Sequence, residues 1–157
     1  MNFISKLSVA VATGGYIGKI PFAPGTFGSI PGLLLYWVMA QMHTRYAVLL
    51  ALAVIAAAVW SAGRAETVMG QKDPGAIVID EIAGMAVVFA GLPLSWPLAI
   101  SGFVLFRIFD IIKPFPVGWL ERQFDGGLGI VIDDVAAGLI CRVILAAALA
   151  VLPAGFG

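Results

Sequence analysis

The chain has 157 residues, of which 61% are hydrophobic and only 11% are charged, and its mean hydropathy is +1.04. A typical soluble domain is about 45–50% apolar and about 25% charged, so this composition excludes an ordinary soluble protein and predicts an integral membrane protein. Nine basic residues balance nine acidic ones, and without a basic excess nucleic acid is not expected as a partner. We expect one membrane domain over residues 1–157.

The first two predicted helices form a hairpin. Residues 29–42 follow a Pro- and Gly-rich stretch, and Thr26 or Ser29 suits the N-cap position of this helix. Residues 46–63 contain no charge and are bracketed by arginines. A segment of this length and composition predicts a helix that crosses the membrane.

Shorter helices follow a polar segment at 64–76. The next stretch is apolar except for Asp80 and Glu81, and the prolines in 91–97 divide it in two. The expected helices after this segment cover residues 77–92, 98–112 and 135–152. The first two rise roughly 24 Å or less, short of a roughly 30 Å hydrocarbon core. The chain is therefore expected to be all-α: a polytopic membrane helical bundle of about five spans, including short or broken helices.

The distribution of basic residues predicts the orientation. With five spans and a cytoplasmic N-terminus, seven basic residues fall on the cytoplasmic side: Lys6, Lys19, Arg64, Lys72, Arg107, Lys113 and Arg122. Only Arg45 falls outside, and Arg142 lies within a span. The same topology brings all nine acidic residues to the cytoplasmic face. If residues 82–106 formed one broken span instead, the basic residues would be distributed less unequally.

Four polar motifs interrupt the apolar sequence: PGTFGS, DPGAIVIDEIAG, FRIFDIIKPFP and GIVIDDVAAG. The first offers the Thr26 and Ser29 hydroxyls and backbone amides beside a helix start, which is either a phosphate cradle or an ordinary N-cap. The third places Arg107 and Asp110 on one helical face, with Lys113 one turn further. These residues either clamp a phosphate or pair with one another.

Four carboxylates lie inside or beside apolar helix ends: Asp80, Glu81, Asp133 and Asp134. Unpaired charges there are costly, and four converging carboxylates repel unless a cation lies among them. Hard oxygen ligands suit Mg²⁺, which also shares phosphate oxygens of a substrate. We therefore expect these residues to bind Mg²⁺, with the Asp133–Asp134 pair at the start of the last helix.

Other nucleophiles are missing or misplaced. His43, the single histidine, is expected on the opposite face, and Cys141 lies within a helix without a phosphate loop. No Walker nucleotide-binding motif is present. The remaining chemistry is phosphoryl transfer to water by a metal, carboxylates and basic residues. Arg142 either reaches toward Asp134 or, the interpretation we favour, bonds a backbone carbonyl or extends to headgroups.

The four motifs, in this order over residues 21–138, resemble the phosphatidylglycerophosphatase A family. The resemblance implies a Mg²⁺-dependent enzyme of the bacterial inner membrane, with its active site on the cytoplasmic face. Such an enzyme removes the terminal phosphate of phosphatidylglycerophosphate and yields phosphatidylglycerol. The motif positions are Gly25, Thr26, Gly28, Ser29, Asp73, Pro74, Asp80, Glu81, Arg107, Asp110, Lys113, Pro114, Asp133 and Asp134.

Combining motif chemistry and resemblance gives three expected groups of site residues. The catalytic group is Asp80, Glu81, Asp110 and Asp134; the substrate-phosphate group is Thr26, Ser29, Arg107 and Lys113; the metal group is Asp80, Glu81, Asp133 and Asp134. Two alternatives are a CDP-alcohol phosphotransferase and a small ion channel or transporter. The first needs an Ala-Arg pair and a further Asp that DGGLGIVIDD does not contain. The second would more often place carboxylates in the middle of the membrane.

Overall fold

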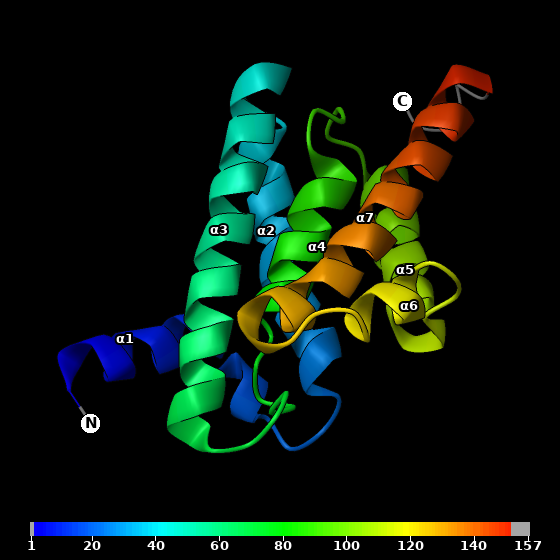
Figure 1. Cartoon of the computed structure of the whole chain (residues 1–157). Coiled ribbons are helices and arrows are strands. Elements are labelled where there is room, and N and C mark those ends of the chain that lie inside the picture. The colour runs from blue at the N-terminus through cyan, green and yellow to red at the C-terminus, as the bar shows by residue number, and fades with distance from the viewer. Residues whose placement is uncertain (1, 152–157) are drawn as a thin grey trace.

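The computed structural model describes residues 2–151, and over that range the chain folds into helices without a strand (Figure 1). The elements in chain order are α1 (Phe3–Ala12), the 3-10 turn η1 (Ile17–Lys19), α2 (Pro24–Met39), α3 (Thr44–Met69), α4 (Ile79–Phe89), α5 (Trp96–Ile112), α6 (Val117–Glu121) and α7 (Gly126–Val151). The expectation of an all-α chain is confirmed.

Five of these helices alternate in direction along the bundle: α2, α3, α4, α5 and α7 (Figure 1). The starts of α2, α4 and α7 and the ends of α3 and α5 therefore lie at one end, which we call the site end. Helix α1 lies across the site end, at a steep angle to α3 (Figure 1). All polar motifs of the sequence lie in or beside these helix ends.

Helix α4 is the centre of the bundle. It packs against α7, α2 and α3 and also contacts α5 and α1, and nearly all of its side chains are buried. Small residues permit the close packing: a methyl group on Gly84 would overlap the ring of Phe106 and lie 2.8 Å from the carbonyl oxygen of Asp134. Because protein surrounds α4, its short length does not expose its ends to lipid.

The outward faces of the bundle are apolar. Each of the helices α2, α3, α5 and α7 exposes large hydrophobic side chains, among them Leu34, Trp37, Leu49, Leu52, Ile100, Val104, Leu139 and Val143. Exposed apolar surface of this extent is typical of a protein that contacts membrane lipid. Among the helices of residues 2–151, α3 and α7 are long and apolar enough to cross a membrane on their own.

Two helices begin earlier than the sequence suggested. Helix α2 has Ala23 at its N-cap and Pro24 in its first turn, a favoured place for proline, so the expected N-cap at Thr26 or Ser29 is wrong. Helix α7 begins at Gly126 rather than at residue 135. Asp133 and Asp134 therefore lie about two turns inside this helix, not at its start.

The other boundaries differ less. Helix α3 continues past residue 63 to Met69 and ends at Gly70, which has a positive φ of 65°, the usual glycine stop of a helix. Helices α4 and α5 lie close to their expected ranges, whereas α1 and α6 were not expected as helices. Leu152, the expected last helical residue, lies outside the described residues.

Candidate functional site

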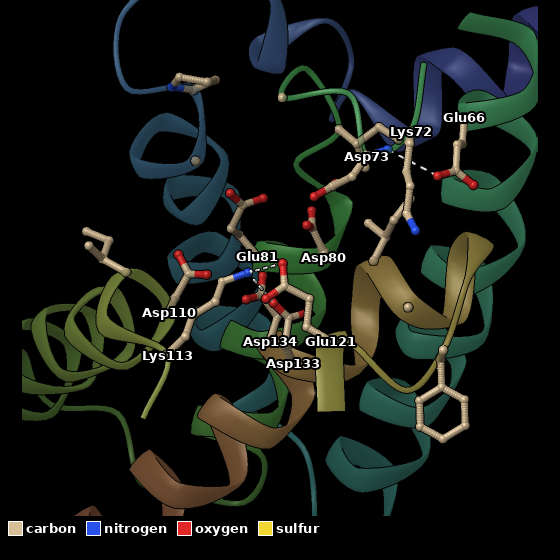
Figure 2. A pocket seen from close by; sticks show the side chains of 18 of the residues that line it. Glu66, Lys72, Asp73, Asp80, Glu81, Asp110, Lys113, Glu121, Asp133 and Asp134 are labelled. Carbon is tan, nitrogen blue, oxygen red and sulfur yellow. Dashed lines mark hydrogen bonds and ion pairs between the residues drawn. The ribbon is translucent and has the colours of Figure 1, made fainter. Parts of the chain in front are cut away.

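The site end contains a hollow of about 440 Å³ between the helix ends and the segment that joins α3 to α4. We call it the acidic pocket. All nine acidic residues of the chain line it: Glu66, Asp73, Asp80, Glu81, Asp110, Glu121, Asp125, Asp133 and Asp134. Three bases, Lys72, Arg107 and Lys113, line it as well, which leaves a formal excess of six negative charges. Figure 2 shows the carboxylates converging from separate helices.

The deepest carboxylates come from α4 and α7. Asp80 and Glu81 occupy the first turn of α4, where the helix dipole favours negative charge. Asp133 and Asp134 project from α7 and are almost completely buried. Since α4 and α7 pack against each other, the second and fourth motifs of the sequence meet in space.

Arg107 connects α5 to this cluster. Its Nη1 atom lies 2.7 Å from Asp110 Oδ2, one turn along the same helix, and 3.7 Å from Glu81 Oε1. All three side chains are mostly buried. The start of α2 covers this group, because a methyl group on Gly25 would overlap Glu81 Oε1 and lie 3.0 Å from Arg107 Nη2.

Lys113 bridges two other helices. Its Nζ atom lies 2.7 Å from Asp133 Oδ2 on α7 and 2.9 Å from Glu121 Oε1 on α6 (Figure 2). Burial works to lower the pKa of Lys113, but its hydrogen bonds to Asp133 and Glu121 outweigh burial and hold that pKa above its ordinary value. The ammonium group therefore stays charged beside the carboxylates.

Four carboxylate oxygens in the pocket are buried and have no hydrogen-bond partner: Asp80 Oδ1, Glu81 Oε2, Asp133 Oδ1 and Asp134 Oδ2. Buried polar atoms in folded proteins are almost always satisfied, so such a concentration is typical of a ligand-binding site. Two sets of three residues bring their oxygens within 4.8 Å of one another: Asp80, Glu81 and Asp134, and Asp110, Asp133 and Asp134. An all-oxygen set of this kind fits Mg²⁺.

Of the site residues expected from the sequence, the structure brings all but Ser29 to the acidic pocket. Ser29 is fully buried, and its hydroxyl donates to the carbonyl oxygen of Gly25 at 2.8 Å. This bond forms because the residue lies inside α2, where serine commonly bonds the carbonyl four residues earlier. Ser29 thus faces the helix, whereas Thr26 faces the pocket.

Three residues at the rim of the pocket were neither motif positions nor expected site residues: Glu66, Lys72 and Asp125. Lys72 forms an exposed ion pair of 2.8 Å with Asp125, and Glu66 Oε1 accepts a hydrogen bond of 3.1 Å from the backbone N–H of Asp73 (Figure 2). Asp73 has a positive φ of 44°, which is uncommon outside glycine. The signal available for Glu66 and Lys72 was the charge of the 64–76 segment, whereas the pairing of Lys72 with Asp125 joins residues 53 apart in the chain.

Residues excluded from the site lie away from it. His43 is the N-cap of α3, at the opposite end of the bundle from the pocket, and Cys141 is buried within α7. Arg142 donates from Nε to the carbonyl oxygen of Ala90 at 3.0 Å, just after the last residue of α4. The interpretation of Arg142 as a structural residue bonded to a carbonyl is confirmed.

A buried carboxylate cluster, a basic pair beside it and an apolar exterior together define a helical protein of the membrane-associated class with an acidic pocket at one end. The sequence profile of the family described as phosphatidylglycerophosphatase A matches residues 10–149. The chain belongs to this family. All four polar motifs lie within the matched range.

Individual relatives agree with this assignment. A phosphatidylglycerophosphatase A of Escherichia coli (strain K12) is 37% identical over 136 residues, which cover 86% of this chain and 79% of that protein. Its counterpart in Haemophilus influenzae is 34% identical over 151 residues, 92% of this chain and 93% of that protein. A Bacteroides thetaiotaomicron protein, named provisionally as a phosphatidylinositol-3-phosphatase, is 36% identical over 154 residues, 92% of this chain and 94% of that protein. No solved structure matches the chain significantly.

Proposed function

We propose that this protein is a Mg²⁺-dependent phosphatidylglycerophosphatase. It hydrolyses the terminal phosphate monoester of phosphatidylglycerophosphate with one water molecule and yields phosphatidylglycerol and inorganic phosphate. The observation that carries the proposal is the gathering of all nine carboxylates of the chain around Arg107 and Lys113 in one pocket. The family match over residues 10–149 supplies the lipid substrate.

The same proposal includes a five-span topology, with α2, α3, α4, α5 and α7 as the spans and the N-terminus in the cytoplasm. The alternating directions of these helices support it (Figure 1). Seven of the nine basic residues lie toward the site end, and a cytoplasmic site end follows the preference of basic residues for that side. The enzyme then works at the cytoplasmic face of the bacterial inner membrane.

The residues that would hold Mg²⁺ are Asp80, Glu81, Asp133 and Asp134, and the geometry adds Asp110. When bound, Mg²⁺ neutralises part of the pocket charge and polarises the phosphoryl oxygens. An arriving phosphate monoester brings up to two further negative charges. Close like charges cannot all remain ionised without compensation, so metal and lipid phosphate would bind cooperatively.

The protein side chains position the phosphate and transfer the proton. Arg107 and Lys113 bind phosphoryl oxygens from two sides, and the Thr26 hydroxyl donates a hydrogen bond to the same group. The remaining reaction needs a carboxylate that orients the attacking group and a proton for the leaving glycerol oxygen. Asp80, Glu81, Asp110 and Asp134 are the groups that perform this acid–base work.

The direct test is phosphate release by the purified protein in detergent with Mg²⁺ present. The substrates are phosphatidylglycerophosphate, phosphatidylinositol 3-phosphate and phosphatidic acid at equal surface concentration. Fastest release from phosphatidylglycerophosphate supports the proposal. Release mainly from phosphatidylinositol 3-phosphate would overturn the substrate assignment, and ion flux in liposomes without phosphate release would overturn the enzymatic role.

A further inference from the structure

A second hollow, of about 390 Å³, adjoins the acidic pocket on the outer side of α5. Its walls carry five apolar side chains of this helix: Phe103, Val104, Ile108, Ile111 and Ile112. Two further residues, Thr26 and Arg107, line both this hollow and the acidic pocket. We call it the apolar groove.

The apolar groove is a stripe along one helix. Val104, Ile108 and Ile111 recur at intervals of three to four residues, which places them on one face of α5. From Ile112 to Phe103 the helix rises roughly 13 Å. The groove therefore leads from the site end, where the phosphate-binding residues lie, along the bundle toward its opposite end.

We propose that the apolar groove holds the glycerol and acyl-chain portion of the lipid substrate while its phosphate lies at Arg107. The lipid then reaches the acidic pocket sideways from the bilayer, past Thr26 of α2. This inference rests on the proposed function and adds to it the surface that binds the apolar part of the lipid.

The position of Arg107 and the continuity of the groove with the acidic pocket favour a phosphorylated lipid as the occupant. A phosphorylated lipid has an anionic head joined to an apolar tail, and the groove has one cationic residue, Arg107, at the point where it meets the pocket. A site built for a water-soluble phosphate ester would not need an apolar extension. The surrounding exterior is also apolar, so lipid is already present beside the groove.

The groove acts by shape rather than by hydrophobic attraction. A lipid tail in the bilayer is already in an apolar medium, and it gains little from moving onto an apolar protein surface. What the groove provides is a fixed orientation of the phosphate ester relative to the carboxylates, and orientation errors of about 1 Å can cost a hundredfold in rate. Filling the groove is therefore expected to lower kcat/KM for the lipid.

Photolabelling tests the location of the chain directly. The probe is phosphatidic acid with a diazirine in the middle of one acyl chain, added to the wild-type protein in mixed micelles. We expect label on residues 103–112 that an excess of phosphatidylglycerophosphate removes and an excess of phosphatidylcholine does not. Label elsewhere on the apolar exterior, such as on α3, is expected to resist both competitors.

Matched substitutions test the effect on turnover. Val104→Trp and Ile108→Trp fill the groove, and each is expected to lower kcat/KM for phosphatidylglycerophosphate about tenfold or more. The controls are Val48→Trp on α3 and Ile144→Trp on α7, whose side chains have similar exposed fractions. Val48 is 42% exposed and Val104 is 48% exposed. Ile144 is 39% exposed and Ile108 is 44% exposed. We expect both controls to stay within about twofold of wild type.

The outcomes separate this proposal from the proposed function. If wild type releases phosphate from phosphatidylglycerophosphate but the competed label falls outside residues 103–112, the groove assignment alone is overturned. If the wild-type protein releases no phosphate, both the groove assignment and the proposed function are overturned. A groove covered by a second copy of the chain would take no competed label and would give a dimer that Val104→Trp dissociates, which also overturns the assignment. The labelling of wild type decides the question even where a Trp variant fails to fold.

Discussion

Gly25 of α2 lies so close to Glu81 of α4 that a methyl group at position 25 would overlap the Glu81 carboxylate oxygen Oε1. The same methyl group would lie 3.0 and 3.1 Å from the two terminal nitrogens of Arg107. A residue without a side chain is therefore required where the start of α2 covers the ion pair. The first polar motif contributes this close backbone approach as well as the Thr26 hydroxyl group.

Gly25→Ala is expected to lower kcat/KM by about tenfold or more, because it displaces Glu81 from the carboxylate cluster or Arg107 from the phosphate position. The matched control is Gly75→Ala. Gly75 also lines the pocket, but an added methyl group there meets nothing within 4 Å. Steady-state phosphate release distinguishes the two variants. Equal activity of both would mean that the tight contact at Gly25 has no catalytic consequence.

Arg107→Ala is expected to raise KM and also lower kcat, since the guanidinium group would bind phosphate in both the ground state and the transition state. Lys72→Ala is the comparison, because Lys72 lines the same pocket but has 80% of its side chain exposed in a surface ion pair. Exposed pairs contribute little, so this variant should keep nearly full activity. Similar losses of activity in both variants would show that activity depends only on the total charge of the pocket.

Lys113→Met should behave differently from Lys113→Arg. The methionine leaves Asp133 and Glu121 without their shared cation, so we expect a raised KM together with a lower melting temperature. Arginine preserves the charge and should recover stability more fully than turnover, because its planar group cannot reproduce the compact ammonium geometry. Turnover by Lys113→Met at wild-type rates and low substrate would remove this residue from the site.

Arg142→Met is expected to reduce stability without changing KM. The substitution removes the hydrogen bond to Ala90 at the far end of α4, which costs about 1 kcal/mol for a partly exposed bond. Thermal unfolding in detergent, alongside substrate kinetics, is the measurement. A changed KM with unchanged stability would instead connect Arg142 to the site.

The helical class and the gathering of the carboxylates with Arg107 and Lys113 in one pocket could both be predicted from the sequence, because charged side chains within apolar segments are costly unless they meet partners. The sequence was less informative about where helices begin. The stretch from Gly126 to Ile132 contains three glycines, which are poor helix formers, and the following aspartates suit a helix start. Tertiary packing overrides both preferences: a methyl group on Gly127 would overlap the carbonyl oxygen of Val59 in α3.

Ser29 and Glu121 both show that a sequence pattern does not determine which side chains reach the pocket. Ser29 belongs to a motif that suggested phosphate binding, yet it lies inside α2 and bonds its own helix. Glu121 was expected at the cytoplasmic face with the other acidic residues but not as a site residue, yet α6 brings it to Lys113. Residue type and motif selected candidates that, apart from Ser29, line the acidic pocket, but the direction of a side chain depends on helix boundaries that local sequence does not determine.

Asp134→Asn is expected to raise the melting temperature of the protein in chelator while abolishing activity. Asp134 belongs to both sets of three carboxylates, so neutralising it removes repulsion from the metal-free cluster. Catalytic groups often reduce stability in this way. The stability gain should be ~1 kcal/mol, comparable to other improvements of surface or site charge. A lower melting temperature in chelator would contradict the view that these charges repel one another.

The most direct test of the account is the response of the wild-type protein to Mg²⁺, measured both as melting temperature and as phosphate release from phosphatidylglycerophosphate. With excess chelator we expect no turnover, and restoring Mg²⁺ should recover it. Saturating Mg²⁺ at about 100 times its Kd should also stabilise the fold by about 2.7 kcal/mol, with no such shift in Asp134→Asn. Full turnover in chelator, or identical melting temperatures with and without Mg²⁺, would contradict the assignment of these carboxylates to a metal site.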